Sequence, residues 1–124
     1  MWNYVAVALG GAVGCCARLG LNQLVHERYG QAFPFATLLI NVSGCALMGF
    51  LFFYTLERVS LSPMMRLAVI TGGLGGFTTF SAFGIETLLL VEDGKLGYAA
   101  LYVTLSVVLG IAAVFAGAWL VRSL

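Results

Sequence analysis

The chain has 124 residues, of which 61% are apolar and 9% are charged, and its mean hydropathy is +1.03. Because soluble domains carry about 25% charged residues, this composition excludes a soluble catalytic domain and predicts one integral membrane domain over residues 1–124. The six basic and five acidic residues nearly cancel, so we expect lipid surroundings and no nucleic-acid partner.

The residues before the first apolar stretch carry no basic group and no cleavage-site pattern, so we do not expect a signal peptide. Trp2 and Tyr4 instead suit the aromatic belt at a membrane surface. Three cysteines, Cys15, Cys16 and Cys45, lie within apolar stretches and lack the spacing of metal ligands. We expect them to be small packing residues.

Four long apolar stretches are typical of transmembrane helices. They cover residues 4–25, 35–56, 67–91 and 98–121, and short connections separate them. Short connections make successive helices antiparallel neighbours. The expected fold is therefore an all-α membrane protein of four helices, with both termini on the same side.

The third stretch contains four glycines within five residues, Gly72, Gly73, Gly75 and Gly76. Glycine weakens a helix, so we expect the third helix to be broken near residues 75–79. Inside hydrocarbon, irregular backbone is tolerated only where it is buried in protein or lines a cavity. The glycines therefore predict that the protein handles a polar species at membrane depth.

Basic residues are distributed almost evenly between the two sides of the predicted bundle. The side with the termini carries Arg58, Arg66 and Arg122, and the other side carries Arg28 and Lys95. The Lys and Arg bias of short loops sets orientation, so a balanced chain is expected to insert both ways. Two such copies would pair as an antiparallel, dual-topology homodimer. The alternative is a fixed orientation set by a weak bias.

One face of the first stretch carries Gly10, Gly14, Arg18 and Asn22 at four-residue steps. The two glycines predict close packing against another helix. Arg18 has two interpretations. Its side chain either extends toward the membrane surface or lines a water-filled vestibule that draws anions inward.

The second stretch carries Thr37, Asn41 and Gly44 on a common face. A buried amide needs a partner, so the interpretation we favour for Asn41 is a hydrogen bond between helices. The alternative is that its amide donates to a permeating anion.

The fourth stretch carries Tyr102, Ser106 and Gly110 on one face, with Thr104 off that face. These hydroxyl groups either bond to the preceding turn of their own helix or form a polar track.

Phe80 and Phe83 follow the glycines and are expected to project from the same side of the third helix. The positive edge of an aromatic ring can contact an anion without trapping it. Glu86, the only acid well inside a stretch, is either a functional residue or an ion-pair partner of Arg18.

Three segments together resemble a known family. Gly10–Gly14 is followed by Arg18, the second stretch contains Thr37–Gly44, and the third contains Gly72–Phe83. In this order, in a four-helix chain of this length, they resemble the Fluc (CrcB) fluoride channels of bacteria. The resemblance covers all four stretches. It implies an antiparallel homodimer with two pores, which conducts fluoride passively out across the inner membrane.

The resemblance also implies roles for individual residues. Arg18 matches the arginine near the aqueous vestibule, and the carbonyl groups of Gly75 and Thr78 match the break that holds one structural sodium ion at the dimer centre. One position departs from the family pattern Phe-Ser-Thr-Phe, because Ala82 lacks a hydroxyl, and this loss predicts reduced conduction if that hydroxyl contacts fluoride. The implied pore-lining residues are Phe80, Phe83, Asn41, Ser81, Tyr102, Thr104, Ser106 and Thr37.

Three other functions fit the residues less well. A proton-coupled exporter of the small multidrug-resistance kind shares the length and the four helices, but it uses a carboxylate in the first helix, where this chain has Arg18. A non-transporting bundle would not need a broken helix beside aromatic and hydroxyl groups. An enzyme is not expected, because the single histidine, His26, lies in a connection and no nucleophile–base pair or metal set is present.

Overall fold

A computed structural model describes all residues from Met1 to Leu124, and the chain is entirely helical with short connections. Four helical stretches are long and apolar enough to cross a membrane, so the chain is a multi-pass membrane protein. The first, second and fourth are α1 (Trp2–Tyr29), α2 (Phe35–Glu57) and α6 (Leu96–Ser123). The third contains α3 (Pro63–Arg66), η1 (Leu67–Leu74), α4 (Gly75–Phe77) and α5 (Phe80–Glu92).

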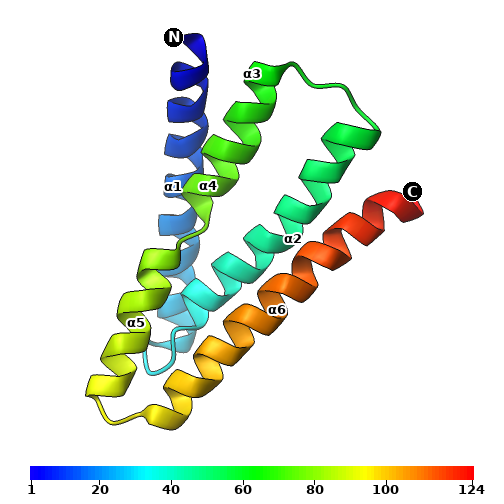
Figure 1. Cartoon of the computed structure of the whole chain (residues 1–124). Helices are drawn as coiled ribbons and strands as arrows, with labels where there is room; N and C mark the ends of the chain where they lie inside the picture. Colours follow the sequence, from blue (N-terminus) through cyan, green and yellow to red (C-terminus); the bar gives the residue numbers. More distant parts are fainter.

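The helices extend beyond the apolar stretches of the sequence. Helix α1 continues to Tyr29, four residues past the predicted end at Val25, because a helix persists into the interface after its apolar composition ends. Both termini lie at the end of the molecule that carries the α2–α3 connection (Figure 1). The α1–α2 and α5–α6 connections lie at the opposite end, as four antiparallel stretches require.

Glycines join α1 to η1 with almost no space between the two backbones. A side chain at Gly10 would collide with the carbonyl of Ala68, and one at Gly14 would collide with the carbonyl of Gly73. Gly72 on the facing side is also confined, because a Cβ there would lie 2.5 Å from the carbonyl oxygen of Val7 in α1. The predicted close packing at Gly10 and Gly14 is confirmed, and we call this contact the glycine seam.

A second pair of helices, α2 and α6, lies side by side along most of their length (Figure 1). This pair also meets through glycine. A Cβ on Gly117 would lie 2.7 Å from the backbone nitrogen of Phe50, and one on Gly49 would collide with the carbonyl of Val114. The bundle is therefore built from two closely packed helix pairs.

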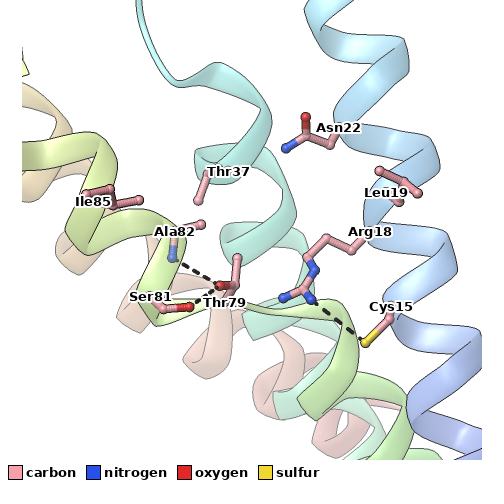
Figure 2. A pocket seen from close by; sticks show the side chains of 9 residues that line it. All are labelled: Cys15, Arg18, Leu19, Asn22, Thr37, Thr79, Ser81, Ala82 and Ile85. Atoms are coloured by element: carbon pink, nitrogen blue, oxygen red, sulfur yellow. Dashed lines mark hydrogen bonds between the residues drawn. The ribbon is translucent and has the colours of Figure 1, made fainter. Parts of the chain in front are cut away.

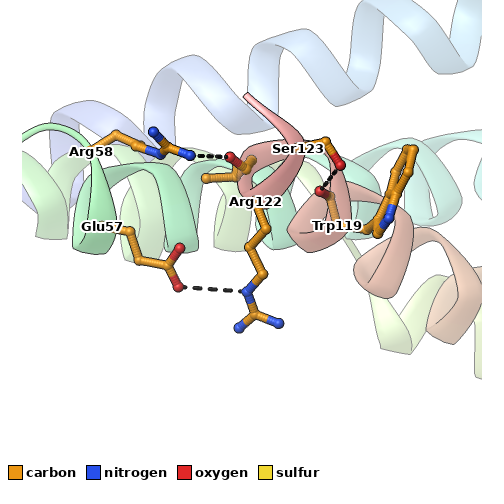
Figure 3. A network of polar contacts seen from close by, with 6 residues as sticks. Glu57, Arg58, Trp119, Arg122 and Ser123 are labelled. Atoms are coloured by element: carbon orange, nitrogen blue, oxygen red, sulfur yellow. Dashed lines mark hydrogen bonds and ion pairs between the residues drawn. The ribbon is translucent and has the colours of Figure 1, made fainter.

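Polar contacts join the ends of α2 and α6 (Figure 3). Arg58 donates from Nη2 to the carbonyl of Val121 at 3.2 Å, and Nε of Arg122 lies 3.7 Å from Oε1 of Glu57. The guanidinium of Arg122 also stacks 4.6 Å from the ring centroid of Phe53. Exposed ion pairs contribute little to stability, so the Arg122–Glu57 pair adds little to the α2–α6 association.

The interruption of the third stretch lies after the glycines. Gly75 has helical dihedral angles, with φ −63° and ψ −36°, while Thr78 (φ −80°, ψ 157°) and Thr79 (φ −150°, ψ 121°) are extended. The glycines before Thr78 belong to η1 and α4, where the π-helical turns of η1 pack against α1. Gly72 and Gly76 pack closely against α1, whereas Gly75 does not, and the chain leaves the helix only at the two threonines.

Candidate functional site

The extended segment Thr78–Thr79 is held by side chains from the neighbouring helices. Asn41 of α2 uses both ends of its amide on Thr79: Nδ2 donates to the Thr79 carbonyl and Oδ1 accepts from the Thr79 backbone N–H, each at 2.8 Å. The Thr79 hydroxyl oxygen in turn accepts the backbone N–H of Ala82 at 3.2 Å, which caps the start of α5. The preferred interpretation of Asn41 as a link between helices agrees with this geometry.

Arg18 of α1 contacts the same segment. Its Nη1 donates to the carbonyl of Thr78 at 3.2 Å, and its Nη2 lies 3.8 Å from the sulfur of Cys15. The guanidinium therefore lies at the interruption in the middle of the bundle, eleven residues before the end of α1 at Tyr29. Of the two interpretations of Arg18, the structure supports a position inside a cavity.

That cavity has a volume of about 710 Å³ and opens between α1, α2 and α5. Figure 2 shows the side chain of Arg18 extending from α1 toward Thr79, with Ser81 and Ala82 on the facing helix. The hydroxyl of Ser81 lies 3.2 Å from that of Thr79. The lining residues are Cys15, Arg18, Leu19, Asn22, Thr37, Thr79, Ser81, Ala82 and Ile85.

A second cavity, of about 290 Å³, also borders the interruption. Its lining includes Asn41, Phe80, Phe83 and Ser106, four of the residues predicted to line a pore, together with both residues of the extended segment. The rings of Phe80 and Phe83 have centroids 5.4 Å apart, which confirms that they project from the same side. Phe80 is 83% exposed in the single chain. The smaller cavity thus brings amide, hydroxyl and aromatic groups together without a formal charge.

The hydroxyl of Ser106 is the only buried side-chain polar atom without a hydrogen-bond partner. It lines the smaller cavity. A serine in a membrane helix commonly bonds to the preceding turn, but Ser106 does not. An unpaired buried hydroxyl is costly, so this hydroxyl is available to bond a polar group in the cavity.

Glu86 forms a polar cluster with two hydroxyl groups. Thr37 donates to Oε1 at 2.7 Å, and Tyr102 donates to Oε2 at 2.6 Å. The alternative in which Glu86 pairs with Arg18 is wrong, because the carboxylate turns toward α2 and α6 while the guanidinium bonds to Thr78. The sequence contained a signal for this cluster, since a lone carboxylate within a membrane helix needs donors and the buried Thr37 and Tyr102 supply them.

Two predicted site positions lie on the outside of the single chain. Thr104 is exposed on α6 and lines neither cavity. Gly75 is also exposed, and a Cβ added there would meet nothing within 4 Å. The open surface at Gly75 leaves room for another chain to approach the backbone.

Residues 5–118 match the family model described as CrcB-like protein, Camphor Resistance (CrcB). The chain belongs to the CrcB-like family. The predicted resemblance is confirmed, and it extends over nearly the whole molecule, including every residue that lines the two cavities.

Curated relatives of this CrcB-like chain carry the name fluoride-specific ion channel FluC. The relative from Acidithiobacillus ferrooxidans is 52% identical over 117 residues, which is 94% of each chain. The FluC 2 protein of Nitrobacter hamburgensis is 48% identical over 122 residues, or 98% of each chain, and that of Roseiflexus sp. is 45% identical with the same coverage. These relatives are named as channels and not as enzymes.

Proposed function

We propose that this chain forms a fluoride-selective channel, which exports fluoride passively across the bacterial inner membrane. The observation that carries the proposal is the unpartnered, buried hydroxyl of Ser106 in a cavity that it shares with Asn41, Phe80 and Phe83. An anion can accept the hydrogen bond that this hydroxyl offers. The names of the relatives give the anion as fluoride.

The physical basis of selectivity is replacement of the hydration shell. Fluoride is smaller and more strongly hydrated than chloride, so a pore that is merely electropositive would favour chloride. The smaller cavity offers neutral donors instead: the Ser106 hydroxyl, the second N–H of the Asn41 amide and the edges of the two phenylalanine rings. Conduction requires several sites of moderate affinity, because a full charge at the narrowest point would hold the ion.

Arg18 supplies the full positive charge in the larger cavity. A cation at the mouth of a narrow path raises the local anion concentration without binding the ion in the constriction. The Ser81 hydroxyl and Thr37 line the same cavity and extend the polar surface. Thr37 also donates to Glu86, so the hydroxyl cluster around Tyr102 adjoins this path.

The proposed assembly is an antiparallel, dual-topology homodimer with two pores. Two features of the single chain support it: the even distribution of basic residues between the two sides, and the 83% exposure of Phe80 beside its cavity. A second copy would cover Phe80 and close the wall of the path. It would also place the exposed Gly75 near the dimer centre.

One structural sodium ion at the dimer centre completes the proposal, with the Gly75 and Thr78 carbonyls of each copy as ligands. Hard cations prefer carbonyl oxygens, and the Thr78 carbonyl already contacts one cation, the guanidinium of Arg18. A carbonyl oxygen has two lone pairs, so it can accept a hydrogen bond and face a metal ion. The chemistry of these groups fits sodium.

The proposal is tested with a fluoride electrode on liposomes that contain the protein and are loaded with potassium fluoride. A passive channel releases fluoride only after a potassium ionophore balances the charge, and it retains chloride under the same conditions. Efflux that proceeds without the ionophore and follows a proton gradient would indicate coupled transport. Efflux no faster than that of protein-free liposomes would contradict the assignment.

A further inference from the structure

In the extended segment, two backbone amides donate to side chains and not to the carbonyls that would accept them in a helix. In an α-helix each backbone N–H donates to the carbonyl four residues earlier. The Thr79 N–H would then donate to Gly75, and the Ala82 N–H would donate to Thr78. In the structure neither bond forms, because the Thr79 N–H donates to Oδ1 of Asn41 at 2.8 Å and the Ala82 N–H donates to Oγ1 of Thr79 at 3.2 Å.

We infer that Asn41 and Thr79 are positioning residues for a cation site, since each diverts the amide that would otherwise occupy the carbonyl of Gly75 or Thr78. The inference rests on the proposed function, because it concerns the sodium ion at these carbonyls. It adds a reason for the location of the site. The side chains of Asn41 and Thr79 each accept a backbone amide. As a result, the carbonyls of Gly75 and Thr78 lack their helical donors.

The contact of Arg18 supports this inference independently. Its guanidinium, a positively charged donor, lies on the Thr78 carbonyl at 3.2 Å. The Thr78 carbonyl, which lacks the Ala82 N–H as a donor, thus accepts a hydrogen bond from a cationic group. The Gly75 carbonyl belongs to an exposed residue with open space at its Cα. A cation can therefore approach from the surface that a second chain would cover.

Thr79 offers a matched pair of substitutions. Thr79→Val has nearly the same shape and suits the extended backbone at φ −150°, but it cannot accept the Ala82 N–H, which becomes available to the Thr78 carbonyl. Thr79→Ser keeps the hydroxyl. Asn41→Ala removes the acceptor of the Thr79 N–H. This amide then becomes available to the Gly75 carbonyl, as the Ala82 N–H does to the Thr78 carbonyl in Thr79→Val. Ser43→Ala is the control, because its hydroxyl bonds only to the Ile40 carbonyl of its own helix.

The measurement is the sodium dependence of thermal unfolding of the purified full-length protein, with an organic cation in place of sodium as reference. Elemental analysis of sodium retained after dialysis into sodium-free buffer provides a second readout. The wild type is expected to gain stability with sodium concentration. Thr79→Val and Asn41→Ala are expected to lose at least about tenfold in apparent sodium affinity, the usual effect of removing a group that orients metal ligands. Thr79→Ser and Ser43→Ala are expected to keep the wild-type response.

The outcomes separate this inference from the proposed function. If Thr79→Val responds to sodium like the wild type, the inference is overturned while the channel and its ion stand. If Thr79→Ser loses the response as fully as Thr79→Val, the diverted amide is not the cause and the inference is again overturned. If the wild type retains no sodium and yet releases fluoride, the sodium part of the proposed function fails together with this inference. Should Thr79→Val not fold, Asn41→Ala decides by the same readouts.

Discussion

The carboxylate of Glu86 accepts a hydrogen bond of 2.6 Å from the phenolic hydroxyl of Tyr102, and this contact joins α5 to α6 inside the bundle. The side chain of Tyr102 is fully buried, and its ring also packs 5.2 Å from that of Phe83. Removing one partner of a buried hydrogen bond leaves the other polar group unsatisfied, which is costly. The contact therefore fixes the helix that carries both phenylalanines of the smaller cavity.

Tyr102→Phe keeps the ring and removes the donor to Glu86. We expect the free energy of unfolding to fall by about 1–3 kcal/mol, because the carboxylate loses one of its two hydroxyl partners. Tyr98→Phe is the matched control, since Tyr98 is 49% exposed and packs edge-on against Phe33. Equal losses for the two variants, measured by denaturant unfolding in detergent, would remove the special role of the Glu86 contact.

Arg18→Gln removes the positive charge from the larger cavity. We expect slower fluoride efflux at low ionic strength and a smaller difference at high salt, because salt screens charge–ion attraction beyond about 10 Å at 0.1 M. Arg28→Gln, an exposed arginine in the last turn of α1, makes the same charge change away from the cavities. The measurement is the initial efflux rate across a salt series. A salt-independent defect would show that Arg18 acts only through its bond to Thr78.

Phe80→Ile and Phe83→Ile each remove an aromatic edge from the smaller cavity. Fluoride efflux is expected to fall by at least about tenfold, which corresponds to a loss of only ~1.4 kcal/mol of stabilisation along the path. Assembly, measured by size-exclusion chromatography, should be unchanged. Phe115→Ile is the control, because Phe115 is 73% exposed on α6 and lines neither cavity. If efflux persists in both cavity variants, the phenylalanines do not line the path.

Asn41→Asp places a carboxylate beside the smaller cavity. The new side chain still accepts the Thr79 N–H but loses the donor to the Thr79 carbonyl, and its charge repels anions. We expect fluoride efflux to fall by at least about tenfold. Asn3→Asp makes the same change in net charge at an exposed position near the N-terminus. Normal conduction by Asn41→Asp would restrict Asn41 to a purely structural link.

Gly14→Val tests the glycine seam. The new side chain would meet the Gly73 carbonyl and the Phe77 backbone nitrogen, the latter 2.9 Å from the Cβ position, so α1 and η1 must separate. Overpacking of this kind costs about 1–3 kcal/mol or more, and we expect a lower yield of folded protein and a lower unfolding temperature. Gly20→Ala on the same helix meets nothing within 4 Å and should be neutral. Similar stability for both variants would contradict the seam.

Hydropathy was sufficient to predict the four membrane helices, because a stretch of about twenty predominantly apolar residues is typical of a membrane span. It did not predict where the third stretch becomes extended. The glycines predicted a break near residues 75–79, and the two extended residues, Thr78 and Thr79, lie at the end of that range, while Gly75 is helical. Asn41, which lies on another helix 38 residues away in sequence, holds Thr79 by two hydrogen bonds, so the local sequence does not show which residues of the range become extended.

The site was predicted in part. Asn41, Phe80, Phe83 and Ser106 converge on one cavity, whereas the carboxylate of Glu86 bonds to hydroxyl groups instead of Arg18. Spacing along a helix tells which residues share a face, but it does not tell toward which neighbouring helix that face turns. The rotation of α5 that brings Glu86 to α2 and α6 follows from packing between helices, and the sequence of one helix does not encode it.

At the glycine seam, α1 and η1 meet through glycine residues, which have no side-chain conformational entropy to lose when they pack. Ordering a long side chain costs up to about 2 kcal/mol, whereas glycine has no such term. Between helices surrounded by lipid, apolar surface gives little driving force, and close van der Waals contact must hold them. By joining bare backbone to bare backbone, α1 and η1 obtain dense contact with almost no loss of side-chain motion. The seam therefore holds the third stretch firmly in the part that precedes the extended residues Thr78 and Thr79.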